Sequence, residues 1–377
     1  RRTTPRLDAL AREGALFEDV TACAAWTKPS TACLFTSRPA TEHGAQTIDD
    51  RLDEAHVTLA EAFGAAGYAT AAFVDNPLVS SRSFGLAQGF DRVAQVARAT
   101  RGANINDLEA EAVHLTRRAD GWLRRHSDER FFAYVHSLDL HAAYRWRPGF
   151  SGRFARRETA TELDLYDGEL AANDAQLGAL ADLLRGRGLL GRTVLAVTAD
   201  HGEEFGEHGT TRHGASLFQT LLRVPLVVLA PGGPRGLRVP APVGNVDVAP
   251  TLLDLAGVPR PPAFSGLSLR PLMSGRPAPP GRTLVAAQLG PRDVIYAARR
   301  GRHKAVRQLL PTPARLLFDL AADPDERRDL SGEASSEGRA LLAELDQLVQ
   351  MGQTGWHIIV GPPSEPGMLE LRVRASV

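Results

Sequence analysis

Short apolar segments rich in β-branched residues alternate with segments of helical periodicity through most of the first 257 residues of this 377-residue chain. This alternation constrains the fold because strands separated by helices form parallel sheets that need helices on both faces. We therefore predict an α/β fold with a central, mainly parallel sheet and helices on both faces. The predicted strands cover residues 15–20, 68–74, 131–137, 193–197 and 224–230. The predicted helices cover residues 5–14, a segment starting near Pro29, and residues 58–67, 106–125, 164–186 and 248–257.

The pattern changes after two loops rich in proline and glycine at residues 231–243 and 259–280. Four short strands without intervening helices and one helix are expected there, which predicts a small antiparallel sheet with a helix. We divide the chain into a catalytic domain at 1–280, a small C-terminal α+β subdomain at 281–351 and a β tail at 352–377 that we leave unassigned. The strands are expected at 283–289, 294–299, 303–308 and 315–320, and the helix at 333–351.

Composition excludes several classes of protein. The chain has 44 basic and 44 acidic side chains, so no overall charge favours nucleic acid or an anionic membrane surface. Cys23 and Cys33 are the only cysteines, which excludes a disulfide scaffold and a cysteine-built zinc site. We expect both to be small buried side chains. No run approaches the roughly 20 apolar residues of a membrane span.

An aspartate and a histidine, Asp200 and His201, follow the apolar run at residues 193–197 and precede Gly202. Ligand crevices of α/β sheets lie at the carboxyl ends of the strands, and carboxylate and imidazole groups are suitable ligands for a divalent metal. Asp200 and His201 are therefore candidate metal ligands. The alternative is a loop whose acidic and histidine side chains are merely solvated.

A candidate nucleophile, Thr27, lies two residues before Pro29, which suits the first turn of a helix. Thr27 is expected just before that helix and Ser30 inside it. A helix N-terminus stabilises an oxyanion, and a hydroxyl becomes nucleophilic when a base or a metal lowers its pKa. Thr27 beside a metal held by Asp200 meets that requirement. The alternative is that Thr27 only caps the helix.

From about residue 3 to about residue 331, the chain resembles the sulfatase family of the alkaline phosphatase superfamily. Motifs in a characteristic order and spacing carry the resemblance. They are Thr4-Pro5-Arg6-Leu7-Asp8, Thr27-Lys28-Pro29-Ser30 with Thr36-Ser37-Arg38 and His43-Gly44, Phe132 through His141, Tyr166-Asp167-Gly168-Glu169, Asp200-His201-Gly202-Glu203 with His213-Gly214, Asp247 through Leu253, and Leu317-Phe318-Asp319-Leu320 with Asp323-Pro324-Asp325-Glu326.

The resemblance implies a role for particular residues of this chain. Thr27 matches the nucleophile, which also contacts the metal. Asp200 and His201 match two metal ligands, and the metal is Ca, Mn or Zn. His141 matches the histidine that contacts the substrate or protonates the leaving oxygen, and His213 matches a basic residue on the transferred group.

Several neighbouring residues leave alternatives open. Arg38 matches the arginine that closes the nucleophile motif, and Lys28, next to Thr27, is a second candidate for substrate binding or else an exposed lysine. Glu203 either orients His201 or is solvated. His136, inside an apolar strand, and His208 are interpreted as structural.

Two departures from the family pattern matter. Sulfatases with a formylglycine nucleophile carry Cys or Ser where this chain has Thr27, and Arg where it has Thr31. Threonine is not converted to formylglycine, so Thr27 resembles the unmodified nucleophile of phosphoester-cleaving relatives such as nucleotide pyrophosphatases and lipoteichoic acid synthase. The family's first strand, which ends in acidic metal ligands, is also expected upstream of Arg1, so these residues hold about half of the metal site.

The predicted function is metal-dependent hydrolysis of sulfate or phosphate esters with Thr27 as nucleophile. Alternatives are a phosphoryl-group transferase of the phosphoethanolamine or glycerol phosphate type, and a catalytically inactive binding module. The expected partner is a small-molecule, saccharide or lipid-linked ester, with no nucleic acid and no membrane span. The compartment is periplasmic or extracellular if an N-terminal signal exists and cytoplasmic otherwise, and the sequence does not fix the oligomeric state.

Overall fold

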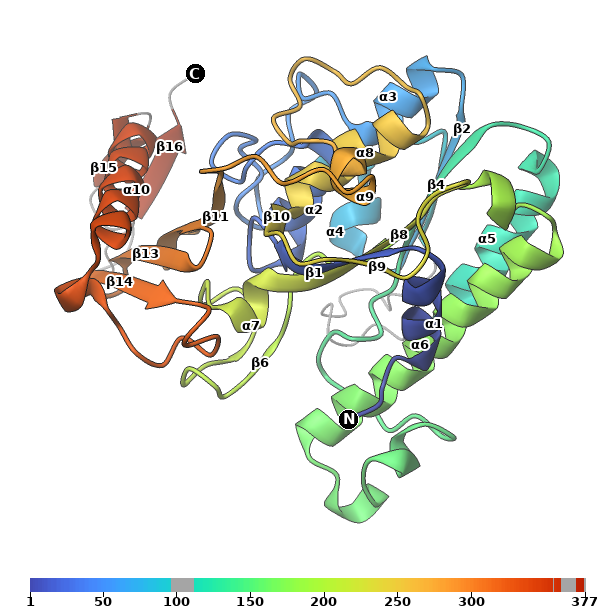
Figure 1. Ribbon diagram of the computed structural model, residues 1–377, viewed down its shortest axis with the longest axis horizontal. Coiled ribbons are helices and arrows are strands. Elements are labelled where there is room, and N and C mark those ends of the chain that lie inside the picture. The colour runs from blue at the N-terminus through green and yellow to red at the C-terminus, as the bar shows by residue number, and fades with distance from the viewer. Residues whose placement is uncertain (96–111, 355, 361–370, 376–377) are drawn as a thin grey trace.

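Two separate sheets form the interior of the main part of the protein, seen in a computed structural model that describes residues 1–95, 112–354, 356–360 and 371–375 (Figure 1). The first sheet has the order β3-β2-β4 and is parallel throughout. The second has the order β10-β1-β8-β5, with β9 also on β1; β8 runs antiparallel to both of its neighbours. The strands are β1 (Ala15–Thr21), β2 (Ala69–Val74), β3 (Arg92–Gln95), β4 (Phe131–His136), β5 (Leu195–Thr198), β8 (Arg223–Leu229), β9 (Leu237–Val239) and β10 (Val243–Gly244).

Helices cover both faces of these sheets, as the sequence predicts. In Figure 1, α1, α5 and α6 lie on one side and α2, α3, α4 and α8 on the other. The helices are α1 (Pro5–Glu13), α2 (Thr27–Thr36), α3 (Leu59–Ala65), α4 (Pro77–Ser80), α5 (Ala112–His126), α6 (Glu162–Gly186), α7 (Gln219–Leu222), α8 (Val248–Leu255) and α9 (Arg270–Met273). The α/β prediction is confirmed. The helix predicted at residues 106–125 corresponds to α5, and its residues 106–111 lie outside the described residues.

The C-terminal part has the predicted antiparallel sheet with a helix packed on it. Its strands follow the order β11-β12-β13-β14, and α10 lies against β12 and β13. A second antiparallel pair, β15 and β16, lies in the predicted tail. The bounds are β11 (Thr283–Leu289), β12 (Val294–Arg300), β13 (His303–Leu310), β14 (Ala314–Asp319), α10 (Ser336–Thr354), β15 (Trp356–Val360) and β16 (Leu371–Ala375). A small hairpin, β6 (Glu204–Phe205) with β7 (Thr211–Arg212), belongs to the loop after β5.

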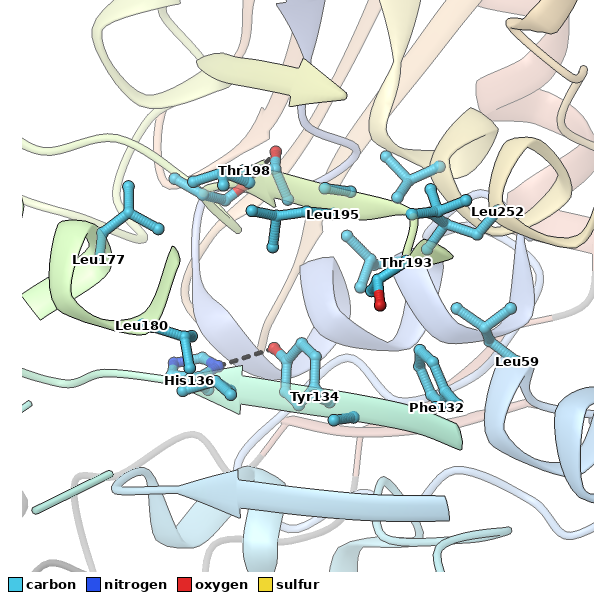
Figure 2. Close-up of a pocket in the computed structure, with 18 of the residues that line it drawn as sticks. Leu59, Phe132, Tyr134, His136, Leu177, Leu180, Thr193, Leu195, Thr198 and Leu252 are labelled. Atoms are coloured by element: carbon cyan, nitrogen blue, oxygen red, sulfur yellow. Dashed lines mark hydrogen bonds between the residues drawn. The ribbon is translucent and has the colours of Figure 1, made fainter. Parts of the chain in front are cut away.

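A cavity of about 1150 Å³ separates the two sheets between β4 and β5. Each of these strands is the edge of its own sheet, and they run in the same direction without pairing (Figure 2). Phe132 and Tyr134 reach into the space from β4, with Leu195 opposite on β5 and Leu177 on α6 (Figure 2). Every residue of both strands is only half-buried. Two mostly apolar strand edges thus face an open space instead of a neighbouring strand.

The two cysteines are joined in a disulfide. Both are buried, as predicted, and the bridge between them is a feature that the sequence analysis did not predict. Cys23 follows β1 and Cys33 lies inside α2, so the bridge spans the segment that contains Thr27. A spacing of ten residues does not predict a disulfide by itself. Cys23 and Cys33 come together only because the loop after β1 folds back against α2.

The apolar stretches of the described helices are all too short or too polar to cross a membrane.

Candidate active site

Thr27 is the first residue of α2, with Trp26 at the N-cap position. The prediction that it precedes the helix is off by one residue, and the N-cap position that the alternative gave to Thr27 is held by Trp26. Its Oγ1 atom lies 3.3 Å from Nε2 of His201. Ser30, one turn along α2, donates a hydrogen bond from Oγ to the backbone oxygen of Asp200 at 2.5 Å. This bond holds the start of α2 against the carboxyl end of β5, so the hydroxyl and the Asp-His pair come together as predicted.

Asp200 presents a buried carboxylate oxygen to the same place. Its Oδ2 atom has no hydrogen-bond partner among the described residues and lies 3.6 Å from His201 Nε2. Burial raises the pKa of this carboxyl, but the imidazoles of His201 and His136 and the nearby Thr27 hydroxyl outweigh it, so the pKa is lowered overall. A buried, charged oxygen without a donor fits a bound cation.

The ring of His201 is oriented by its own neighbour. Its Nδ1 donates to the backbone oxygen of Gly202 at 2.8 Å, which leaves the Nε2 lone pair directed at Thr27 and Asp200. Gly202 is required there because a Cβ at this position would lie 2.0 Å from the backbone oxygen of Thr220. The backbone approaches α7 closely, and the Gly202 amide donates to the oxygen of Leu221 at 2.7 Å.

Asp200, His201 and Thr27 bring together donor atoms of the kind that a divalent metal binds. Within the described ranges, no group of three or more His, Cys, Asp or Glu side chains is arranged to hold a metal ion. Asp200 and His201 are two suitable ligands, and the Thr27 hydroxyl is a third oxygen beside them. The expectation of about half a metal site stays a prediction.

His213 is held by a buried carboxylate. Its Nδ1 lies 2.9 Å from Oε1 of Glu203, and the Tyr144 hydroxyl donates to Oε2 of Glu203 at 2.6 Å. Burial raises the pKa of Glu203, but the bonds from His213 and Tyr144 outweigh it and lower the pKa overall. Burial and the Glu203 charge raise the pKa of Tyr144. Glu203 thus orients His213, whereas the prediction paired it with His201.

His141 lies beside His213. Their ring centroids are 5.0 Å apart, and those of His213 and His201 are 4.4 Å apart. The Nδ1 atom of His141 donates to the backbone oxygen of Ala142 at 2.8 Å, and burial lowers the pKa of this imidazole. Three imidazoles, each fixed through Nδ1, therefore line the same cavity as Thr27. All three were predicted site residues.

Lys28 and Arg38 do not line this cavity. The ammonium group of Lys28 donates to the backbone oxygens of Ile48 at 2.5 Å and Asp50 at 2.8 Å and lies over the Phe84 ring. Burial lowers the pKa of Lys28 to about 8. Arg38 follows the far end of α2 and donates to Glu42 at 3.2 Å. Neither side chain is directed into this cavity, so the structure lends their predicted substrate-binding role no support, and the alternative of an exposed Lys28 is wrong.

His136 and His208 have structural contacts. The Nδ1 atom of His136 lies 2.8 Å from the Tyr134 hydroxyl (Figure 2), and burial lowers the pKa of the imidazole. His208 stacks on Phe218 with ring centroids 3.8 Å apart and meets Glu204 at 3.0 Å. Both contacts agree with the structural interpretation.

Two positioning residues escaped the sequence analysis. Tyr144 lies in an irregular segment after β4, where no periodicity or motif distinguishes it. Asn245 donates to Ser30 Oγ at 2.9 Å and accepts from the Cys23 amide at 3.1 Å, so it holds the chain on both sides of Thr27. Its position two residues before the Asp247 motif was the available signal.

A sequence model of the family described as Sulfatase matches residues 1–258, which is more than half of the chain. The chain belongs to the sulfatase family. A second model, described as N-sulphoglucosamine sulphohydrolase, C-terminal, matches residues 206–353. The two matches overlap at residues 206–258 and together cover residues 1–353 of this sulfatase-family chain.

Relatives with curated names include arylsulfatase K of Mus musculus, which is 31% identical over 209 residues. That match covers 53% of this chain and 37% of the relative. Arylsulfatase K of Danio rerio is 37% identical over 153 residues, covering 41% and 27%. The chain thus spans less than half the length of these curated relatives.

Solved structures share the fold over nearly the whole chain. A protein in complex with its substrate D-glucosamine-2-N,6-O-disulfate has a TM-score of 0.74 and 20% identity, covering 93% of each chain. The phosphonate monoester hydrolase of Silicibacter pomeroyi has a TM-score of 0.70 and 19% identity, covering 94% of this chain and 93% of the other. At these identities the likeness establishes the sulfatase fold.

Proposed function

We propose that the protein hydrolyses sulfate esters, with the hydroxyl of Thr27 as the attacking group. The observation that carries the proposal is the 3.3 Å approach of Thr27 Oγ1 to His201 Nε2, beside the unpartnered Asp200 oxygen. Membership of the sulfatase family and the named arylsulfatase relatives support sulfate as the group transferred.

The reaction has two steps on the residues of this chain. Thr27 Oγ1 gives up its proton to solvent and attacks the sulfur in line, and the bond from sulfur to the leaving oxygen breaks. His141, when protonated on both ring nitrogens, donates the Nε2 proton to the leaving oxygen and regains a proton from the water that attacks in the second step. His213, fixed by Glu203, donates a hydrogen bond to an oxygen of the transferred group. Water then attacks the sulfur and releases Thr27.

A divalent cation, Ca, Mn or Zn, would be held by Asp200, His201 and Thr27. When bound, it supplies positive charge that lowers the pKa of the Thr27 hydroxyl and stabilises the developing oxyanion. The buried Asp200 oxygen supports this assignment.

We propose that a further strand, lying before Arg1 in a longer form of the chain, fills the cavity between β4 and β5 and brings acidic ligands to Asp200. The edges of β4 and β5 that face the cavity have no strand paired to them, and both strands run in the same direction (Figure 2). The side chains of both strands are only half-buried, which supports the proposal. The guanidinium group of Arg1 forms ion pairs with Asp164 at 2.5 Å and Asp167 at 2.8 Å. These two aspartates flank Tyr166 in the sequence, and Tyr166 lines the cavity. A strand entering the gap parallel to its neighbours would therefore end near Arg1.

Phosphate esters are a second candidate substrate. An unmodified threonine at the nucleophile position and the fold shared with a phosphonate monoester hydrolase favour them.

We also propose that the protein works in an oxidising compartment outside the cytoplasm. The disulfide between Cys23 and Cys33 supports this, since such bonds persist in oxidising compartments.

The test compares the 377-residue chain with a form extended by the codons upstream of Arg1. Divalent-cation binding is measured by calorimetry, and turnover with aryl sulfate and aryl phosphate esters. We expect tighter metal binding and measurable turnover in the extended form, with Thr27→Ala reducing kcat by about a thousandfold and Thr27→Ser retaining part of it. Unchanged turnover in Thr27→Ala would overturn the mechanism. Products that form only when an alcohol acceptor is added would identify a transferase, and an extended form without metal binding would identify a binding module.

A further inference from the structure

Glu204 directly follows Glu203 in the sequence, but its carboxylate is buried and does not line the cavity. The side chains bonded to this carboxylate all come from the segment between His208 and α7, which carries His213. They are His208 through Nδ1 at 3.0 Å, the Thr210 hydroxyl, the Ser216 hydroxyl at 3.2 Å and the Thr220 hydroxyl at 2.8 Å. A buried carboxylate needs such donors, so Glu204 gathers residues from both sides of His213 around one point.

His208 extends this network to the C-terminal part of the chain. Its Nε2 atom lies 2.9 Å from the backbone oxygen of Asp325, in the turn that follows β14. Its ring also stacks on Phe218, just before α7. The imidazole therefore bridges the loop after β5 and the turn after β14.

Lys304 of β13 makes a second link to the same segment, and its side chain is buried. The ammonium group donates to the backbone oxygen of Leu217 at 2.5 Å and forms an ion pair with Glu326 at 2.6 Å. The carboxylate of Glu326 also accepts from the Gln219 amide. Glu326 has a φ of 54°, a left-handed conformation that surrounding contacts must hold in a residue with a side chain. In Figure 1, α7 and β6 accordingly lie beside β13 and β14.

The segment held in this way adjoins the candidate active site at two points. The Gly202 amide, directly after the candidate metal ligands, donates to the Leu221 oxygen of α7 at 2.7 Å. Glu204 adjoins Glu203, whose carboxylate holds His213. The side chains from the C-terminal part that hold this segment do not line the cavity. Any effect that they have on the reaction must therefore pass through the segment.

We propose that Lys304 is a positioning residue that, together with Glu326 and His208, fixes the loop carrying His213. This inference rests on the proposed function for the role of His213. The C-terminal part then contributes to the reaction by holding this loop. Loss of the link should lower kcat and leave KM nearly unchanged, because His213 acts on charge that develops in the transition state.

Hydrogen–deuterium exchange of the 377-residue chain, followed by mass spectrometry, tests the link without any turnover. The first variant combines Lys304→Met with Glu326→Gln, so that no charge is left unpaired in the interior. The second, His208→Phe, keeps an aromatic stack and removes both contacts of the ring nitrogens. The control is Arg299→Met. Arg299 lies opposite Lys304 on β12, and its buried guanidinium group donates to Asp19 of β1 instead of the His213 loop. Thermal melting checks that each variant is folded.

We expect exchange in residues 204–216 to become about tenfold faster in both variants, while β2 keeps its wild-type protection. The control should stay within about twofold of wild type in residues 204–216. In the form extended upstream of Arg1, kcat should fall about 30-fold in both variants, with KM within about threefold of wild type.

Unchanged exchange of residues 204–216 in the folded variants, or an equal rise in the control, would overturn the proposal. Faster exchange with wild-type kcat would also overturn it, since the loop could then loosen without affecting the reaction. If the extended wild type turns over neither ester, the proposed function fails, whereas the exchange data still decide whether Lys304 holds the loop.

Discussion

The imidazole of His213 is hydrogen-bonded to the carboxylate of Glu203, with 2.9 Å between Nδ1 and Oε1. The Tyr144 hydroxyl occupies the other oxygen of the same carboxylate. Glu203 lies in the turn after β5 and His213 beyond the β6–β7 hairpin, so this bond fixes the loop that carries His213 against the strand end that carries His201.

Replacing Glu203 by Gln is predicted to lower kcat by about 100-fold in the active form of the protein, because the imidazole loses the partner that orients it. The change is isosteric, and KM is expected to move by less than about threefold. Initial rates with an aryl sulfate ester measure both constants. Tyr144→Phe is the matched comparison, since it keeps the carboxylate and the ring; a smaller loss of about tenfold is expected. A Glu203→Gln enzyme with unchanged kcat would show that His213 needs no such partner.

Much of this site could be predicted because motif residues lie at the ends of regular elements. Asp200 and His201 follow a recognisable strand, and Thr27 begins a recognisable helix. Lys28 was misplaced because adjacency in sequence says nothing of direction: successive helical residues point about 100° apart, and Lys28 turns to carbonyl groups of the next loop.

Other features depend on tertiary contacts that leave no local pattern. Tyr144 acts through a carboxylate 59 residues away. The disulfide depends on the path of the chain between β1 and α2. The alternation of strands and helices predicted the α/β class, but not that β8 runs antiparallel, because strand direction depends on where each connection crosses the sheet.

Reduction of the Cys23–Cys33 disulfide is predicted to lower the free energy of unfolding by about 3 kcal/mol, since the bridge closes a short loop in the unfolded chain. Urea unfolding with and without reductant measures the change. The double variant Cys23→Ala, Cys33→Ala should unfold like the reduced wild type and be insensitive to reductant. Identical wild-type curves in both conditions would show that the bridge contributes nothing to stability.

A buried ion pair is predicted to matter more for stability than an exposed one. Arg282 makes two bonds to Asp247, of 2.7 and 2.6 Å, and the Asp247 carboxylate is fully buried while also accepting from the amides of Gly244 and Leu267. Arg282→Ala should cost about 3 kcal/mol because a buried charge is left without its partner.

The control for Arg282 is Arg270→Ala. Arg270 pairs with Asp254 at 3.0 Å on the surface, with more than half of its side chain exposed. An exposed pair contributes about 0–1 kcal/mol. Chemical denaturation of both variants gives the comparison, and equal losses would contradict the assignment of the difference to burial.

Stability should also depend on pH through Glu169. Its side chain is buried in α6, beside Arg147 at 3.2 Å and near Asp139, and it accepts from the Arg145 amide. Burial raises the pKa of this carboxyl from 4.5 to about 7, in spite of Arg147. Between these two values the folded protein binds more protons than the unfolded chain, so the free energy of unfolding falls as pH rises.

The contribution of Glu169 is therefore present below pH 4.5 and is lost as pH passes about 7, a change of about 3 kcal/mol. Glu169→Gln keeps an oxygen acceptor but cannot ionise. Urea unfolding curves at pH 5 to 8 give the free energy of unfolding of both proteins. We expect the wild type to lose stability relative to Glu169→Gln as pH rises. Glu158→Gln, at an exposed position in the neighbouring loop, should leave the pH dependence unchanged. A constant difference between wild type and Glu169→Gln across this range would mean that Glu169 stays ionised in the folded protein, with Arg147 outweighing its burial.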